Sequence, residues 1–315
     1  FRIAYFESPA YVPMALRSLE GWRALEKTTD QNLLTTTGGL DMGPPSGRLV
    51  PGALAACATH GIDHEHWDSA ELARRAPGLS LPQGVEAVFQ PDAAILNPTR
   101  STGAHLNAAR TAGADLHFRA RVCRLEPGGE GVRVRAQVEG TEGEVEYLAE
   151  RVIVTAGAWL GHLMEGSELP EIVPERQVVG WLPHIEGSGA RHRFPVVNAD
   201  LEEGHVYFMP GHDGRGVKVG LYHHRHEAIR TPDTPDDAPD AADRELLQGI
   251  ADRYLAVSHP IRHMRTCRFT LTPDEHFILD TLHAGRVVVG GGFSGHGFKF
   301  APALGEILTA LALIG

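Results

Sequence analysis

A strand, a glycine-rich turn and a helix follow one another near the C-terminus, and this unit constrains the fold more than any other stretch. Val287, Val288 and Val289 are consecutive β-branched residues, which is typical of a strand covered on both faces. Five glycines then lie within residues 290–297, and glycine lets another group approach the backbone closely. Pro302 suits the first turn of the helix that the following apolar spacing predicts. Such a unit favours an anion or polar ligand at the start of the helix, although a plain connection fits it equally well.

A second unit of the same kind lies in the middle of the chain. Residues 151–154 predict a short buried strand, small residues including Thr155 and Gly157 follow it, and a helix is predicted after Trp159. In open α/β sheets, ligands bind where turns of this kind gather at the carboxyl ends of the strands. The two units together predict an α/β fold with both turns near one ligand.

The remaining pattern predicts helices around a mainly β region. Helices are expected over residues 11–26, 52–61, 69–75, 100–112 and 241–254, with Ser69 as the cap of the third. Strands are expected over residues 33–40, 84–90, 113–125, 131–138, 142–147, 177–182, 204–209, 216–222, 266–270 and 277–280. The acidic loop 233–243 should cap the last of these helices, and its charge is interpreted as solvated surface. The segments predict two interleaved domains rather than two consecutive ones.

The charge of the chain argues against two classes of partner. A net charge of −11 disfavours nucleic acid or an anionic membrane, because both bind basic faces. No apolar run approaches the roughly 20 residues that span a bilayer, and the start has no signal-peptide pattern. The three cysteines are widely spaced, which makes a reducing, cytoplasmic location the default. The chain does not begin with Met, and both of its ends are interpreted as cut from something longer.

Two side chains with reactive head groups lie in predicted strands. Lys218 alternates with apolar neighbours, where the commoner case is a lysine that points to solvent from an edge strand. Cys267 lies near Arg265 and beside Arg268, and these guanidinium groups would favour a thiolate. A thiol packed inside the sheet is the alternative that the sequence favours for Cys267.

Three histidines crowd together at positions 223, 224 and 226, but no acid or cysteine accompanies them at the spacing of metal ligands. A metal site there is therefore judged unfavourable. No Gly-x-Ser-x-Gly, Walker loop or paired-cysteine motif is present, which weakens the hydrolase and nucleotide-hydrolysis interpretations.

Taken together, several stretches resemble the monomeric sarcosine oxidase family of D-amino-acid-oxidase-like flavoenzymes, which includes N-methyltryptophan oxidase. The most specific is Gly-Gly-Phe-Ser-Gly-His-Gly-Phe-Lys-Phe at residues 291–300, preceded by Thr-Pro-Asp-Glu-His-Phe-Ile-Leu-Asp at 272–280. Residues 11–18, 155–159, 176–180 and 216–218 also match in the same order, as does Cys267. The resemblance covers nearly the whole chain.

The resemblance implies a cofactor and a set of site residues. It implies FAD, attached covalently through its 8-methyl group to Cys267. It implies that Lys218 activates oxygen, that His296 lies beside the flavin and the substrate, and that Arg2 and Lys299 bind the substrate carboxylate. Further positions implied to line the substrate pocket or contact the cofactor are Tyr5, Tyr207, Val122, Thr155, Gly157, Gly292, Phe293, Gly295 and Gly297.

The resemblance also implies a reaction and a domain plan. Residues 1–30, 101–163 and 277–315 would form an incomplete, Rossmann-like FAD-binding domain, and residues 31–100 and 164–276 a mainly antiparallel substrate domain. A secondary or tertiary amino acid would be oxidised to an imine by a monomeric enzyme, with O₂ reduced to H₂O₂. A dehydrogenase that uses another acceptor, or a non-catalytic fragment, are the alternatives.

Three departures from the family pattern bear on these expectations. The Gly-x-Gly-x-x-Gly unit that opens the family does not precede Arg2, and the last element of the family does not follow Gly315. Phe269 lacks a hydroxyl that is often found at its position, which bears on the substrate. Another active-site histidine is expected at Tyr222 or His223, with the register open by one residue.

Overall fold

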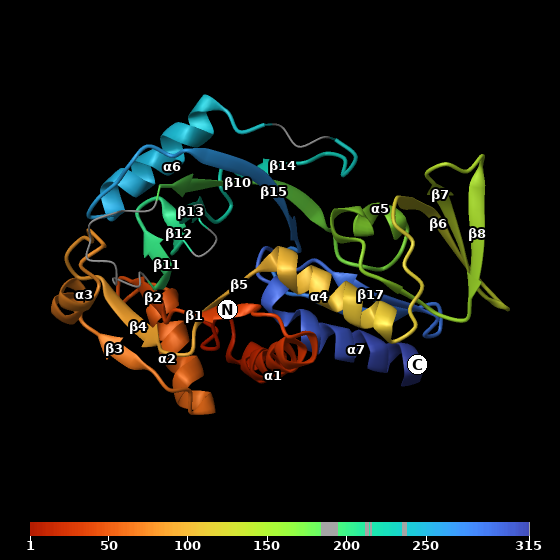
Figure 1. The fold of residues 1–315 in the computed structure, drawn as a ribbon, viewed down its shortest axis with the longest axis horizontal. Helices are drawn as coiled ribbons and strands as arrows, with labels where there is room; N and C mark the ends of the chain where they lie inside the picture. Colours follow the sequence, from red (N-terminus) through yellow and green to blue (C-terminus); the bar gives the residue numbers. More distant parts are fainter. Residues whose placement is uncertain (184–194, 212–213, 215, 235–237, 315) are drawn as a thin grey trace.

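The computed structural model describes residues 1–183, 195–211, 214, 216–234 and 238–314. Its largest sheet runs in the order β14-β10-β13-β12-β11-β2-β4-β3, with β15 also paired to β10 (Figure 1). All of these pairs are antiparallel except β11 with β2. The strands are β2 (Gly39–Gly43), β3 (Glu65–Trp67), β4 (Glu86–Gln90), β10 (Val173–Leu182), β11 (Val196–Leu201), β12 (Gly204–Met209), β13 (Val217–Leu221), β14 (Glu227–Ala228) and β15 (His263–Leu271).

The two faces of this sheet differ because side chains alternate along each strand. On one face, the directly opposite residues Leu40, Val197, Phe208 and Val219 are all buried. They belong to a core that also contains Leu247 and Ile250 of α6 (Ala241–Tyr254) and Leu72 of α3 (Ser69–Arg75). The other face is left for polar side chains.

The strand predicted from the three valines is β17 (Val287–Gly291), and it is buried along its whole length. It pairs parallel to β9 (Val152–Val154) and antiparallel to β16 (Ile278–Leu282). A Cβ on Gly290 would lie 2.8 Å from Leu308 of α7 (Ala301–Ile314), and one on Gly291 would lie 2.1 Å from Leu160 of α5 (Leu160–Leu163). Both faces of β17 are therefore covered by helices at van der Waals distance, as expected, and Pro302 lies in the first turn of α7.

Three further helices and two small sheets complete the described part of the chain. Helices α1 (Val12–Thr29) and α4 (Pro98–Thr111) lie beside one another, and α1 also packs against α7 (Figure 1). Helix α2 (Leu49–His60) lies against β2 and β4. The small sheets are β1 (Leu34–Thr36) with β5 (Ala94–Leu96), and β6 (Ala120–Gly128), β7 (Gly131–Val138) and β8 (Glu144–Ala149). The 3₁₀ turns are η1 (Pro9–Tyr11), η2 (Gly157–Trp159) and η3 (Phe298–Phe300). No helix in the described residues is long and apolar enough to cross a membrane.

Three of the expected elements are wrong in detail. The strand predicted over residues 33–40 is divided into β1 and β2, because Gly38 has a φ of +70° and the N–H groups of Thr37 and Gly38 both donate to Ala93 O. The strand predicted from residue 113 begins only at Ala120, after Arg119 in the left-handed region. The cap of α3 is Asp68 rather than Ser69, since the Asp68 carboxylate accepts from Glu71 N–H at 2.8 Å.

The acidic loop before α6 caps that helix, as predicted, through a reciprocal pair of bonds between Asp240 and Asp243. However, its charge is not all solvated surface, because the side chain of Asp243 is 0% exposed and bonds to Arg176. Residues 235–237 of this loop lie outside the described part of the chain.

Candidate active site

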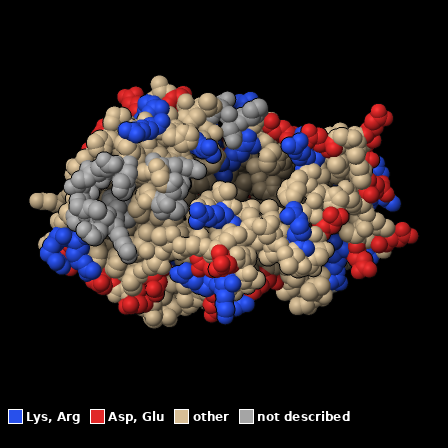
Figure 2. Space-filling model, in the orientation of Figure 1, with Lys and Arg blue, Asp and Glu red and all other residues tan. Residues whose placement is uncertain are grey.

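A cavity of about 470 Å³ lies between the polar face of the large sheet, the N-terminal segment and the glycine-rich turn. Figure 2 shows this side of the molecule hollowed, with Lys and Arg side chains around the hollow. The structure brings together around this cavity seven of the residues predicted for the site: Arg2, Tyr207, Lys218, Cys267, Gly295, His296 and Lys299.

The sheet presents its polar side chains to the cavity in rows. Asp41, Asn198 and Tyr207 lie directly opposite one another on β2, β11 and β12, so they share the cavity face. The ring of Tyr207 crosses to β13 and covers Gly220, where a Cβ would lie only 2.2 Å from the ring. Burial raises the pKa of Tyr207, so its phenol stays neutral.

Lys218 lies in the next row of the same face, opposite Met209 and Trp181. Its Nζ is 5.5 Å from the ring centroid of Tyr207 and 5.9 Å from that of Trp181. The edge-strand interpretation of Lys218 is wrong, because β13 is paired on one side with β10 and on the other with β12. The lysine thus presents its charge to the cavity between two aromatic rings.

Cys267 lies on β15, opposite Gln177 of β10, and its side chain is exposed where it lines the cavity. The alternative of a packed strand thiol, which the sequence favoured, is therefore wrong for this residue. Cys57 provides the contrast, since it is buried in α2 and burial raises the pKa of its thiol to about 11. Cys267 is thus the thiol that a ligand in the cavity can reach.

Arg2 lies against two carboxylates and two rings. Its Nη2 donates to Glu7 Oε1 at 2.7 Å, its Nε lies 3.9 Å from Asp41 Oδ1, and its guanidinium stacks on Tyr5 and Phe6 at 4.6 Å. Burial alone would lower the pKa of Arg2, but Glu7 and Asp41 more than offset burial and raise it above its usual value. The guanidinium is therefore charged at neutral pH.

Gln90 of β4 connects this N-terminal segment to the sheet. Its Oε1 accepts from the backbone N–H groups of Ile3 at 3.1 Å and Ala4 at 2.7 Å, so its amide group must donate to Asp41 Oδ2, at 2.8 Å. Asn198 donates to the other oxygen of Asp41 at 2.9 Å. The position of Arg2 at the cavity therefore depends on a buried amide and a buried carboxylate that lie far from it in the sequence.

Lys299, Tyr5 and His296 form a chain of hydrogen bonds at the glycine-rich turn. His296 Nε2 faces Glu275 O at 3.0 Å, and a carbonyl only accepts, so Nε2 carries the proton. Nδ1 then accepts from the hydroxyl of Tyr5 at 2.5 Å, and that hydroxyl accepts from Lys299 Nζ at 3.3 Å. Burial and the charge of Lys299 lower the pKa of His296 to about 4, which agrees with this neutral tautomer.

The ammonium of Lys299 is held by neutral acceptors, since Nζ also donates to His296 O at 3.1 Å. Trp22 Nε1 in turn donates to Lys299 O at 2.8 Å and fixes the backbone. Burial and the charge of Arg2 lower the pKa of Lys299 to about 7. Arg2 and Lys299 therefore place two cations on one wall of the cavity. Lys299 has no close carboxylate among the described residues, and this favours an anionic ligand.

The glycine-rich turn leaves donors at the cavity. The N–H groups of Gly295, Gly297 and Phe298 have no acceptor within the described ranges, and Gly295 and Phe298 line the cavity. Gly295 has a φ of +80°, and a Cβ there would lie 2.6 Å from the ring of Phe269. A flat polar ring with anionic character fits this set of donors, with Cys267 and Lys218 on the sheet side, so the residues present suit a flavin.

The other predicted residues do not line this cavity. Tyr5 is buried behind it, and Gly292, Phe293 and Gly297 shape the turn from inside, where Phe293 packs on Phe277. Thr155 follows β9 directly and Gly157 is the first residue of η2, whereas Val122 lies on β6, which pairs with β7 in the separate three-stranded sheet. Of the two positions where a histidine was expected, Tyr222 lines the cavity, whereas His223 bonds to Glu175 and Glu275.

Sequence reasoning missed several residues of the cavity, namely Glu7, Asp41, Gln90, Trp181, Asn198 and His205. His205 stacks on Tyr222 at 5.4 Å and contacts Asn198 Oδ1 at 3.2 Å, and burial and Arg2 lower its pKa to about 4. Period-two alternation could have found it, because His205 lies two residues from Tyr207 on one strand and so shares its face.

The family model described as FAD dependent oxidoreductase, abbreviated DAO, matches residues 2–311. The monomeric sarcosine oxidase of Streptomyces avermitilis is 35% identical, over 100% of this chain and 82% of its own length. The N-methyl-L-tryptophan oxidase of Salmonella arizonae is 29% identical, over 99% of this chain and 82% of its own. Among solved structures, the open form of NikD, an unusual amino acid oxidase essential for nikkomycin biosynthesis, has a TM-score of 0.83 at 23% identity, covering 99% of this chain and 82% of its own. Glycine oxidase from Geobacillus kaustophilus has a TM-score of 0.76 at 19% identity, covering 100% and 81%.

Proposed function

Because the chain belongs to the FAD-dependent oxidoreductase family and has the α/β flavoprotein fold of that family, we propose that it oxidises N-substituted amino acids with O₂ as acceptor. It is an FAD-dependent amine oxidoreductase. The observation that carries the finer proposal is the cavity itself, where Arg2 and Lys299 lie on one wall and Lys218 and Cys267 on the facing sheet.

Arg2 and Lys299 hold the substrate carboxylate. Lys299 offers a point charge that only neutral groups contact in the described residues, and Arg2 offers a planar fork that Glu7 keeps in place. Two fixed cations orient the carboxylate, and this places the neighbouring amine carbon toward the sheet side of the cavity. His296 has both ring nitrogens bonded, so we assign it a positioning role through Tyr5 rather than proton transfer to the substrate.

Bound FAD would supply the redox chemistry, namely oxidation of the C–N bond to an imine and reduction of O₂ to H₂O₂. Cys267 would hold the ring covalently, since it is the exposed thiol at the cavity. Lys218 would stabilise the negative charge that develops on oxygen, because its ammonium faces the cavity beside two aromatic rings. The free N–H groups at Gly295 and Phe298 would face the anionic end of the reduced ring.

The division into two domains belongs to the same proposal. One apolar core joins residues of β7, β9, α5, β16 and β17, and a second joins the large sheet to α3 and α6. The proposed division takes residues 1–30, 101–163 and 277–315 as the FAD side, and residues 31–100 and 164–276 as the substrate side. A third core packs the N-terminal segment and the start of α7 against α2 and Val88, so it joins the two sides. The active protein is proposed to be a monomer.

The test is a panel of N-methyl and cyclic amino acids, scored for H₂O₂ with a peroxidase-coupled dye and, in parallel, for reduction of an artificial acceptor without O₂. Substrate-dependent H₂O₂ supports the oxidase, whereas turnover with the artificial acceptor alone identifies a dehydrogenase. Acid precipitation of the purified protein should leave yellow flavin in the pellet, and Cys267→Ala should release it to the supernatant. Flavin that stays acid-stable in Cys267→Ala would refute the covalent link.

A further inference from the structure

We propose that Glu175, His223 and His226 form a binding site for a divalent transition-metal ion of the Zn²⁺ type. One ligand atom from each of the three residues lies within 4.8 Å of the others. Two imidazoles and a carboxylate are a donor set that Zn²⁺ and its neighbours in the first transition row accept. The sequence disfavoured such a site because no acid or cysteine accompanies the histidines at the spacing of metal ligands, but β10 brings Glu175 to them.

The two histidines are presented to one carboxylate by a tight turn. His223 Nδ1 lies 2.9 Å from Glu175 Oε1, and His226 Nδ1 lies 3.9 Å from Glu175 Oε2. The N–H of His226 donates to His223 O at 2.8 Å, and both residues have positive φ, so their rings stack at 5.5 Å with 9° between planes. Zn²⁺ bonds of about 2.0–2.1 Å place ligand atoms about 3.3 Å apart. The three ligand atoms lie within 4.8 Å of one another, so they must close by up to about 1.5 Å, a movement open to His226 because its side chain is 78% exposed.

The surroundings of the ligands are those of a metal site. His223 Nε2 donates to Glu275 Oε1 at 3.1 Å, which leaves Nδ1 as the nitrogen directed at Glu175. Gln177, on the same face of β10, donates to Glu175 Oε1 at 2.6 Å. Carboxylates and amides that orient the ligands in this way are typical of metal centres.

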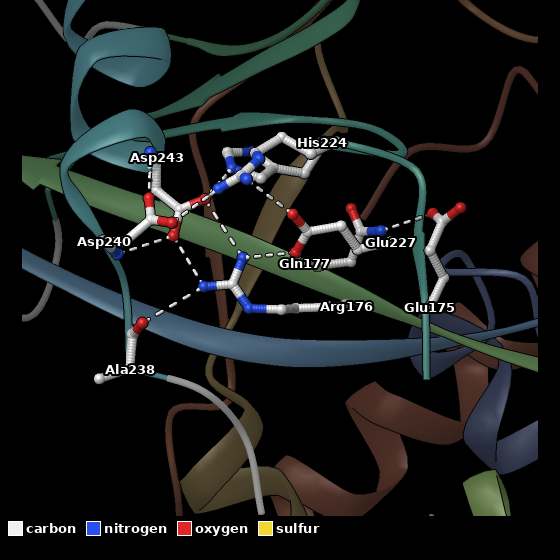
Figure 3. Close-up of polar contacts among 9 residues, drawn as sticks. Glu175, Arg176, Gln177, His224, Glu227, Ala238, Asp240 and Asp243 are labelled. Carbon is white, nitrogen blue, oxygen red and sulfur yellow. Dashed lines mark hydrogen bonds and ion pairs between the residues drawn. The ribbon is translucent and has the colours of Figure 1, made fainter. Parts of the chain in front are cut away.

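The turn is held in position before any ion binds. The two residues between the histidines, His224 and Arg225, donate to Asp243 Oδ1 at 2.9 and 3.1 Å. Arg176, which follows Glu175 on β10, donates to Asp243 Oδ2 at 2.7 Å. Figure 3 shows this network between β10 and the start of α6, with Glu175 and Gln177 on the strand beside Arg176. The ligands from two distant segments are therefore positioned by one buried carboxylate, which lowers the ordering cost of binding.

The experiment is isothermal titration of the full chain with ZnCl₂ at pH 7.5, after dialysis against EDTA and then metal-free buffer. We expect one saturable site per chain. His226→Ala and Glu175→Gln should each weaken binding at least tenfold, and Glu275→Gln about 10–100-fold as an outer partner. The control is His117→Ala, which removes an exposed histidine that lies 2.9 Å from a single carboxylate, Asp115, and should bind Zn²⁺ as the wild type does.

His226 is exposed, so its variant tests the site even if Glu175→Gln fails to fold. The proposal is overturned if the wild type shows no saturable Zn²⁺ binding up to about 1 mM. It is also overturned if His226→Ala binds as the wild type does, or if His117→Ala loses as much affinity as His226→Ala. None of these readouts depends on turnover, so they stand apart from the proposed oxidase function.

Discussion

Asp243→Asn should be among the most destabilising conservative substitutions in this chain. The Asp243 side chain is 0% exposed and accepts from Arg176 at 2.7 Å, from His224 at 2.9 Å and from the N–H of Asp240 at 2.9 Å. Arg225 adds a fourth donor at 3.1 Å. Asparagine keeps the shape but removes the charge. The Arg176 guanidinium, whose side chain is 8% exposed, then stays in the interior with Glu227, at 3.2 Å, as its nearest carboxylate within the described ranges.

The magnitude follows from that unpaired charge. Removing one partner of a buried ion pair costs about 3–5 kcal/mol. At roughly 2.1 cal/mol/K per residue, the 315 residues give an unfolding entropy of about 0.66 kcal/mol/K. Dividing the two predicts a fall in Tm of about 5–8 °C, measured by circular dichroism at pH 7.

The pH dependence has a fixed sign. Burial alone would raise the pKa of Asp243, but Arg176 and the other donors more than offset it, so the pKa lies below its usual value. A carboxylate with a depressed folded pKa contributes stability above its unfolded pKa of about 3.9, and that contribution is lost as the pH falls. The difference in Tm between wild type and Asp243→Asn should therefore be constant from pH 7 to 5 and shrink below about pH 4.

Glu202→Gln is the matched control. It removes the charge from an ion pair of similar length, 2.9 Å to Arg253, whose side chains are 82% and 53% exposed. Exposed pairs contribute about 0–1 kcal/mol, so the Tm should fall by less than about 2 °C. The reasoning is refuted if Asp243→Asn melts within about 1 °C of the wild type, or if the two variants fall by the same amount.

Three other predictions concern the cavity. Lys218→Met should slow reoxidation of reduced flavin by O₂ at least about 100-fold, because one oxyanion-type donor is lost. Substrate should still reduce the flavin at a near-normal rate. Equal slowing of both half-reactions in stopped flow would contradict this. Because the pKa of Lys299 is lowered to about 7, its charge is lost as the pH rises, and propionate should bind up to tenfold more weakly per pH unit above 7. This trend should vanish in Lys299→Met, and a flat wild-type profile from pH 6 to 9 would show that the lysine keeps its charge. Gly220→Ala places a Cβ 2.2 Å from the Tyr207 ring, so it should lower the free energy of unfolding by about 1–3 kcal/mol and raise KM. The control Gly249→Ala in α6, whose Cβ would have no atom within 4 Å, should do neither. An unchanged KM in Gly220→Ala would mean that the ring moves without cost.

Much of the local structure could be read from the sequence because it depends on neighbours along the chain. The three valines, the glycines after them and Pro302 predict β17, its turn and α7 through backbone preferences alone. The start of α4 after Asn97 and the start of α6 after Asp240 follow from capping side chains that accept from N–H groups three residues on. The family resemblance added Arg2, Lys218, Cys267 and Lys299 as one site, and all four line the same cavity.

Other features depend on which strands are neighbours, and no short pattern in the chain contains that information. Lys218 alternates with valines whether its strand is at an edge or inside, and only the pairing of β13 with both β10 and β12 places it at the cavity. Gln90 reaches Asp41 and the backbone of Ile3 across 49 and 87 positions, and Glu175 reaches His223 across 48. A hydrogen bond requires two groups to lie about 3 Å apart in space, whatever their distance along the sequence. The sequence by itself therefore determined the strand, the turn and the helix of the glycine-rich unit, whereas the tertiary structure decided which charges meet there and which histidines find a carboxylate.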